Sequence, residues 1–393
     1  MDVSKDNVTC CLLTTRVEPR KLYLDHEFPR LYANTIGIKG LLSLKPNVAV
    51  LEPTGMNYTK IWVTKLIEAG VEVVLVGHKQ LKIHRVAIGL PDKDDEADSL
   101  ALADYYQSYC HDPTRFVRMR DPLVAQMRDL VLRLHHQARV QSPIINRLRQ
   151  DLIWQYPEGA KRSLDAIIFW RWLAGEGKSG KYDLEYANTC GLGLTDFTRE
   201  SAQVLNKVMR QELEIDRQLR ECLHDARFNS YRQIMAKFGM GERVQALIIS
   251  QIYPLQNYLE NNEPIMILSR SKTKPGKQTT KHISERKFTK ALGMSPEREW
   301  SGDGKKTKKS GSELCRTAMW QWLFTRVEVK RCRPVNLPVV NWEIDHDLHR
   351  LDSGTLADYF DWLKGRMPIK LARSKTCAKA VKALFYELVA TID

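Results

Sequence analysis

Four carboxylates in the first hundred residues are spaced as the ligands of a divalent metal site would be. Glu52 directly follows the apolar run at residues 47–51. Asp95 and Asp98 are three residues apart, so a helix would present both on one face, within reach of ions about 4 Å apart as in two-metal phosphoryl transfer. Together with Asp2 they predict a Mg²⁺ site, because Mg²⁺ prefers hard oxygen ligands.

Residues 94–98 also have a simpler interpretation. An acidic first turn stabilises a helix by complementing its dipole, and this segment taken alone favours that explanation. The presence of Glu52 and Asp2 shifts the balance towards a metal site.

Strands and helices in alternation would position these acids. Short β-favouring runs around Glu18-Pro19, within residues 8–25, predict a hairpin. Apolar spacing and stop signals predict helices near residues 36–44, 58–69 and 94–106, and buried strands at 47–51 and 71–76. This order predicts an α/β N-terminal domain, a mixed sheet covered by helices.

The rest of the chain predicts mainly helices. Apolar residues recur at helical spacing over 121–153, where Pro143 is a candidate break, and over 198–224, where they form a coiled-coil-like stripe. These two segments predict a helical hairpin, and the apolar stripe of the second is explained equally by core packing and by dimerisation.

The Gly-rich stretch 175–180 predicts a loop. A turn at 239–241 resembles a helix-hairpin-helix that could bind phosphate, although a plain turn is the commoner explanation.

Positive charge is concentrated in one part of the sequence. The net charge is +14, yet residues 1–106 hold 13 Lys/Arg against 14 Asp/Glu. Residues 270–333 hold 18 Lys/Arg against 6 Asp/Glu, a surplus of 12. Such a patch favours a nucleic-acid backbone as partner over a merely solubilising surface.

Several classes of protein are disfavoured by composition. The apolar runs are too short to cross a bilayer, no signal segment opens the sequence, and the prediction is a cytoplasmic, nucleoid-associated protein without a membrane partner. Eight cysteines without a C-x-x-C pair fit neither a disulfide scaffold nor a zinc site, and predict reduced thiols.

Three motifs together resemble one family. M-D-V-S-K, E-P-T-G and K-D-D-E-A-D-S, in this order, resemble the DEDD transposases of the insertion sequence 110 family, which are related to Piv-type DNA invertases. The resemblance continues with residues 292–300, then Ser301-Gly302, then G-S-E-L-C-R at 311–316. It is strongest over residues 1–106 and 283–324.

The resemblance implies a fold and a set of parts. These are an RNase H-like, RuvC-like metal domain (1–115), a mainly α-helical connector (116–230), a basic C-terminal domain with a nucleophilic serine (231–333) and a helical extension (334–393). Asp2, Glu52, Asp95 and Asp98 would then be catalytic metal ligands, and Ser301 the nucleophile. The implied partners are donor and target DNA, a structured noncoding guide RNA, and further copies of the chain as dimers that pair into tetramers.

A serine hydroxyl is a weak nucleophile at neutral pH and needs a base or a metal. Ser301 would attack a phosphate polarised by Mg²⁺, hold the strand as a phosphoserine ester, and allow rejoining without external energy. Ser310, also followed by glycine, is the competing candidate. The cations expected to contact the nucleic acid are Lys305, Lys306, Lys308, Lys309 and Arg316.

Two departures from the family pattern leave alternatives open. The sequence starts Met1-Asp2, so the strand before the first acid is short, and Gly77-His78-Lys79 replaces a usual Asn-Pro. The alternatives are a Mg²⁺-dependent junction nuclease that uses water without a serine intermediate, and an inactive element protein that only binds RNA or DNA.

Overall fold

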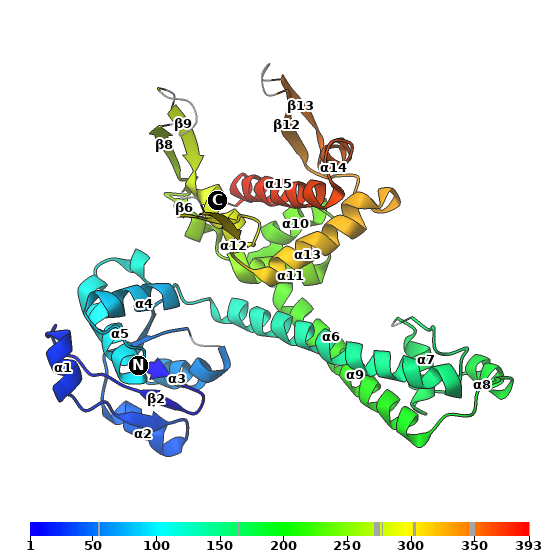
Figure 1. Cartoon of the computed structure of the whole chain (residues 1–393), viewed down its shortest axis with the longest axis horizontal. Coiled ribbons are helices and arrows are strands. Elements are labelled where there is room, and N and C mark those ends of the chain that lie inside the picture. The colour runs from blue at the N-terminus through cyan, green and yellow to red at the C-terminus, as the bar shows by residue number, and fades with distance from the viewer. Residues whose placement is uncertain are drawn as a thin grey trace. The chain divides into compact units, whose positions relative to one another are not determined.

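A computed structural model describes residues 1–53, 56–163, 165–270, 276, 278–301, 304–345 and 350–392, with the backbone alone at 56, 298–301, 304–306, 344–345 and 350–351. The chain divides into two compact units, Met1–Arg120 and Asp121–Asp393. The first mixes strands and helices, and the second is mainly helical with small hairpins (Figure 1). The predicted α/β N-terminal part and helical remainder are confirmed at this level.

Unit 1 contains two small sheets. Strands β1 (Asp2–Val3), β2 (Asn7–Thr9) and β3 (Arg30–Tyr32) form an antiparallel meander, while β4 (Val48–Leu51) and β5 (Glu72–Leu75) pair in parallel. One further bond connects the two sheets: the Met1 amino group donates to the carbonyl oxygen of Val50 at 2.9 Å, in a buried position. A continuous RNase H-like sheet remains a prediction.

The predicted hairpin within residues 8–25 is wrong in its second half. Residues 21–24 lie in helix α1 (Pro19–Asp25). The Glu18 carboxylate accepts hydrogen bonds from the backbone N–H groups of Arg20 and Lys21, and Pro19 occupies the first helical turn. Glu18-Pro19 is therefore a helix start, at which proline is favoured because its missing N–H would have no intrahelical partner.

Helices cover both faces of the parallel pair. Successive strand residues point to opposite faces, so Ala49 and Leu51 pack with the core beneath α2 (Thr35–Ser43) and α3 (Met56–Glu68), whereas Val50 packs with α5 (Asp95–Tyr109). These elements match the prediction to within a few residues. Helix α4 (His78–Ala87) was not predicted, because its sequence is mostly polar and has few apolar residues.

Two long helices dominate the start of unit 2. Helices α6 (Pro122–Gln155) and α9 (Asp196–Leu223) lie side by side (Figure 1), and Pro143 stays inside α6 without ending it. Within the predicted stripe of α9, Val208, Leu219 and Cys222 are buried in the protomer. The hairpin is thus confirmed, and core packing explains most of the stripe. Helices α7 (Ile167–Leu173) and α8 (Gly180–Ala187) close its far end over an aromatic core.

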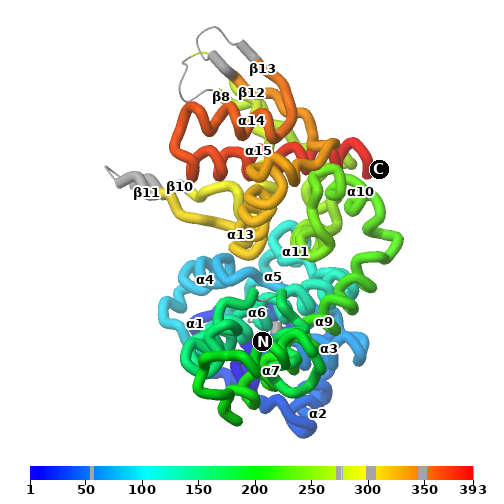
Figure 2. The backbone as a smooth tube through the Cα atoms, turned by 90° about the vertical axis from the view of Figure 1, so that its right-hand side faces the viewer, coloured from blue at the N-terminus to red at the C-terminus, as the bar shows by residue number. Residues whose placement is uncertain are grey.

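The C-terminal part of unit 2 is a helical cluster with protruding hairpins. Its core joins α10 (Asn229–Lys237), α11 (Glu242–Ile252), α13 (Glu313–Trp322) and α15 (Ile369–Val389). Helix α14 (Leu356–Lys364) lies beside α15 in both views (Figures 1 and 2). Trp322 is buried here, which favours a core role over base stacking.

The remaining elements are short. They are β6 (Leu259–Glu260), β7 (Glu263–Pro264), β8 (Met266–Arg270), β9 (Gln278–His282), α12 (Ile283–Ala291), β10 (Glu297–Ser301), β11 (Gly304–Lys308), β12 (Val339–Asp345), β13 (Arg350–Thr355), the π-helical η4 (Leu323–Glu328) and the 3-10 turns η1 (Pro113–Arg115), η2 (Ala226–Phe228), η3 (Leu255–Tyr258) and η5 (Lys330–Cys332). The eight cysteines are free thiols, as predicted. Within the described ranges, no helix is long and apolar enough to cross a membrane.

Candidate active site

The four predicted acids come from three neighbouring elements of unit 1. Asp2 lies in β1, Glu52 follows the last residue of β4, and Asp95 and Asp98 occupy the first turn of α5. The pKa of Asp2 is raised to about 6, first by burial and then by the negative charges of Asp95 and Asp98, with a smaller contribution from Glu52. The Met1 ammonium opposes this shift. All four carboxyl groups therefore share one electrostatic environment.

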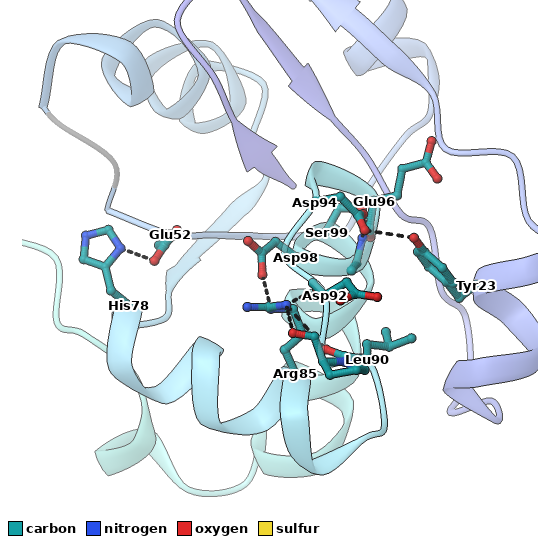
Figure 3. A network of polar contacts seen from close by, with 12 residues as sticks. Tyr23, Glu52, His78, Arg85, Leu90, Asp92, Asp94, Glu96, Asp98 and Ser99 are labelled. Atoms are coloured by element: carbon teal, nitrogen blue, oxygen red, sulfur yellow. Dashed lines mark hydrogen bonds and ion pairs between the residues drawn. The ribbon is translucent and has the colours of Figure 1, made fainter.

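Asp98 is the most buried of the four acids. It is 5% exposed, and burial is the main cause that raises its pKa, with Glu52 adding to the effect. Arg85 opposes this shift: its Nε lies 2.8 Å from Asp98 Oδ1, and the arginine is itself 4% exposed (Figure 3). The buried guanidinium therefore offsets part of the cost of burying the Asp98 charge, and the pKa of Asp98 stays raised on balance.

Glu52 has a polar neighbour of its own. His78 Nδ1, from the first residue of α4, contacts Glu52 Oε1 (Figure 3). The His78 side chain is 62% exposed, whereas that of Glu52 is 13% exposed. The departure from the family pattern at residues 77–79 therefore falls beside a predicted metal ligand, which sequence reasoning did not anticipate.

Asp94 has the structural role that the simpler interpretation predicted. Its carboxylate caps α5 by accepting from the N–H of Ala97 at 2.7 Å, and it accepts from the hydroxyl of Tyr23 at 2.9 Å. The cap sets where the helix begins. It thereby places Asp95 and Asp98 on the first turn, so capping and a metal site are compatible in this segment.

The donor chemistry suits Mg²⁺, since all four groups are carboxylates, drawn from three neighbouring elements. Among the residues that the structure describes, however, no three Asp, Glu, His or Cys side chains are arranged to hold a metal ion. Asp98 and Glu52 instead contact Arg85 and His78.

The predicted nucleophile belongs to unit 2. Ser301 ends β10 and pairs with Gly304 at the start of β11. The side chains of Ser301, Lys305 and Lys306 lie outside the described part of the structure, as does Gly302. Lys308 and Lys309 are exposed, which is compatible with contacts to phosphate.

The other motif residues close the base of this hairpin. Gly311 has φ of +77°, and a side chain there would overlap the carbonyl oxygen of Lys290. Arg316 Nη1 donates to the carbonyl oxygens of Gly293 at 3.2 Å and Ser310 at 3.4 Å. Arg316, predicted to bind nucleic acid, therefore ties together the segments that flank β10 and β11. The G-x-x-x-x-R pattern thus has a structural basis.

Comparison with known proteins adds no relative. No protein-family model matches the sequence, and no curated protein matches it.

Proposed function

We propose that this protein is a site-specific DNA recombinase or transposase of the DEDD type, which cleaves and rejoins strands by phosphoryl transfer. The observation that carries the proposal is the placement of the acids: Asp2 lies on β1, Glu52 directly follows β4, and Asp95 and Asp98 lie on the first turn of α5, which packs against both strands. The raised pKa of Asp2 supports it. Groups so separated in sequence share an environment only because the fold gathers them. Clustered carboxylates with shifted pKa values are typical of catalytic sites.

The strand arrangement supports a RuvC-like fold for unit 1. The structure has two separate sheets, β1-β2-β3 and β4-β5. The single bond from Met1 to Val50 supports the proposal that they form one sheet, whose order would be β3-β2-β1-β4-β5. Asp2 would then lie on a central strand, next to the end of β4 that Glu52 follows. This is the position that the resemblance predicts for the first acid.

The proposed mechanism assigns a role to each group. Asp2, Glu52, Asp95 and Asp98 would hold Mg²⁺, which when bound polarises the scissile phosphate and stabilises charge on the leaving oxygen. The Ser301 oxygen forms a bond to phosphorus while one phosphorus–sugar oxygen bond breaks. The serine proton passes to the departing sugar oxygen, and the phosphoserine ester keeps the bond energy for rejoining.

The basic segment supports a nucleic-acid substrate. The surplus of 12 positive charges over residues 270–333 surrounds Ser301, and Lys308 and Lys309 are exposed. We extend the proposal to donor and target DNA, a structured guide RNA, and dimers that pair into tetramers. The exposed Val204 and Leu213 on α9 are the apolar side chains that support an additional helix contact.

The test uses a nicked suicide DNA substrate with Mg²⁺. The wild-type protein should form a protein–DNA adduct that resists denaturation, and Ser301→Ala should abolish the adduct, with Ser310→Ala as the matched control that keeps it. Asp95→Ala should remove cleavage while DNA affinity stays unchanged. Cleavage that survives undiminished in Ser301→Ala would instead identify a hydrolytic nuclease, and an unchanged function in Asp95→Ala would identify a binding protein without catalysis.

A further inference from the structure

Arg85 is a buried cation in unit 1 that the mechanism above does not use. It lies on α4, is 4% exposed, and pairs with Asp98. Burying a guanidinium is costly unless its N–H groups find partners. Arg85 has partners at two places: Nε forms an ion pair, though not a hydrogen bond, with Asp98, and Nη1 donates hydrogen bonds to backbone carbonyls. These are the two places that set the geometry of the acidic cluster.

The first place is Asp98 itself. Arg85 Nε lies 2.8 Å from Oδ1, so the ion pair engages one of the two carboxylate oxygens (Figure 3). A contact of this kind orients a carboxylate and fixes which oxygen faces the rest of the cluster. Metal-binding carboxylates are commonly held in this way by groups that do not touch the metal.

The second place is the segment that leads into α5. Arg85 Nη1 donates to the carbonyl oxygens of Pro91 at 3.0 Å and of Leu90 at 3.4 Å, and also to that of Asp92 (Figure 3). This segment runs directly into Asp94, the cap of α5. One guanidinium thus ties together the start of the helix and a ligand on its first turn.

We propose that Arg85 is the positioning residue of the metal site, which holds Asp98 and the start of α5 in the geometry that binds the ion. The proposal rests on the proposed function, because it assigns the ion to the same four acids. The planar guanidinium with its fixed fork of N–H groups is essential to this role. A lysine would keep the charge but could not reach a carboxylate and the backbone carbonyls together.

A different role would produce the opposite result. If Arg85 were only a counter-ion that neutralises Asp98, it would compete with the metal, and removing its charge would strengthen metal binding. Arg85→Gln removes the charge and the fork, whereas Arg85→Lys removes only the fork. Comparing the two variants separates geometry from charge.

The experiment measures Mn²⁺ binding to the full-length protein without DNA, by calorimetry or by the loss of the free Mn²⁺ signal in electron paramagnetic resonance. Positioning predicts that Arg85→Lys and Arg85→Gln each raise the Mn²⁺ dissociation constant about 10- to 100-fold. Lys82→Gln removes one exposed positive charge from the same helix and is the matched control, expected to change the constant less than twofold. Unchanged or tighter binding in Arg85→Gln would overturn the proposal.

Two further measurements separate the possible failures. In an Asp98→Asn background, adding Arg85→Lys should change Mn²⁺ affinity much less than it does in the wild type, since its partner is gone. Thermal unfolding in EDTA shows whether each variant is folded. A loss of fold in Arg85→Lys would also overturn the proposal, because Arg85 would then serve the stability of unit 1 rather than ligand geometry.

The experiment distinguishes a failure of the proposed function from a failure of this inference. A wild-type protein that binds no Mn²⁺, or whose Mn²⁺ affinity is unaffected by Asp98→Asn, would contradict the metal site itself. If the wild type and Asp98→Asn behave as expected but the Arg85 variants match the Lys82→Gln control, only the assignment of Arg85 is wrong.

Discussion

The carboxyl group of Asp2 shows how position changes the chemistry of a single residue. The same side chain on a flexible chain would ionise near pH 3.8, and here burial and two neighbouring acids raise its pKa to about 6. Buried like charges disfavour further ionisation, so the cluster favours either a proton or a cation. Arg85 supplies a cation to Asp98, and the His78 imidazole contacts Glu52.

Asp2→Asn should change the pH dependence of stability in EDTA. Because the folded pKa is raised, Asp2 contributes stability below about pH 3.8 that is lost as the pH rises through about 6. The variant should therefore gain about 1 kcal/mol over wild type at pH 7.5, after discounting for solvent screening, and little at pH 4. Urea unfolding at both pH values measures this.

The exposed Asp25→Asn is the control for that experiment, and it should show no difference that grows with pH. If the difference between Asp2→Asn and wild type is the same at both pH values, the four acids do not interact as described.

At the scale of elements, β1 is the shortest of the strands described in unit 1. The strand is two residues long, and burial lowers the pKa of its Met1 amino group. A cavity of about 450 Å³ lies beside it. Its walls come from residues on both sides of the line of β1: Met1, Cys10, Cys11, Leu12, Leu13, Thr14, Leu41, Leu44, Lys45, Pro46, Asn47, Val48, Ala49, Val50, Ala103, Tyr106 and Gln107.

Three valines added before Met1 should extend β1 into this cavity. The Met1 amine becomes a neutral amide that still donates to Val50, and the register of Asp2 with Thr9 would bring the new residues alongside Cys11 and those that follow it. Filling the cavity with apolar side chains should stabilise the protein by about 1–2 kcal/mol. Calorimetric unfolding in EDTA measures the gain, and a Ser-Asp-Ser extension of equal length should give none. Equal melting temperatures for the two extensions would refute the prediction that the valine extension fills the cavity.

At the scale of the whole molecule, acids and excess positive charge belong to different units. Residues 1–106 are nearly neutral, and the surplus of 12 lies in residues 270–333. Unit 1 carries the acids, and unit 2 carries Ser301 and its basic surroundings. Nucleic-acid affinity should therefore arise mainly in unit 2, by electrostatic attraction that salt weakens.

DNA binding should accordingly lose salt dependence when unit 2 loses charge. Lys308→Gln combined with Lys309→Gln should reduce the slope of log affinity against log salt by about 2, because each phosphate contact contributes roughly 0.9. The slope is measured by fluorescence anisotropy with a short duplex, over an approximately fourfold range of salt from about 50 to about 200 mM. The pair Lys79→Gln and Lys82→Gln in unit 1 is the control, and an equal effect of the two pairs would contradict the assignment.

Local signals in the sequence determined most of the elements. Asn34 before α2, Asp94 before α5 and the apolar spacing of α6 and α9 depend on neighbours a few residues away, so these helices could be predicted. The same logic failed at Glu18-Pro19, where a turn and a helix start have similar local signals. Helix α4 is mostly polar and was missed.

The sequence was thus sufficient to name the predicted acids, whereas the tertiary structure decided which groups surround them. Residues 2, 52, 95 and 98 could be named from type and spacing, and the structure brings their charges together. The contacts of Arg85 with Asp98 and of His78 with Glu52 could not be predicted, because both residues come from the helix that local patterns missed. Which charge compensates a buried carboxylate depends on packing between distant segments, and no local spacing encodes that.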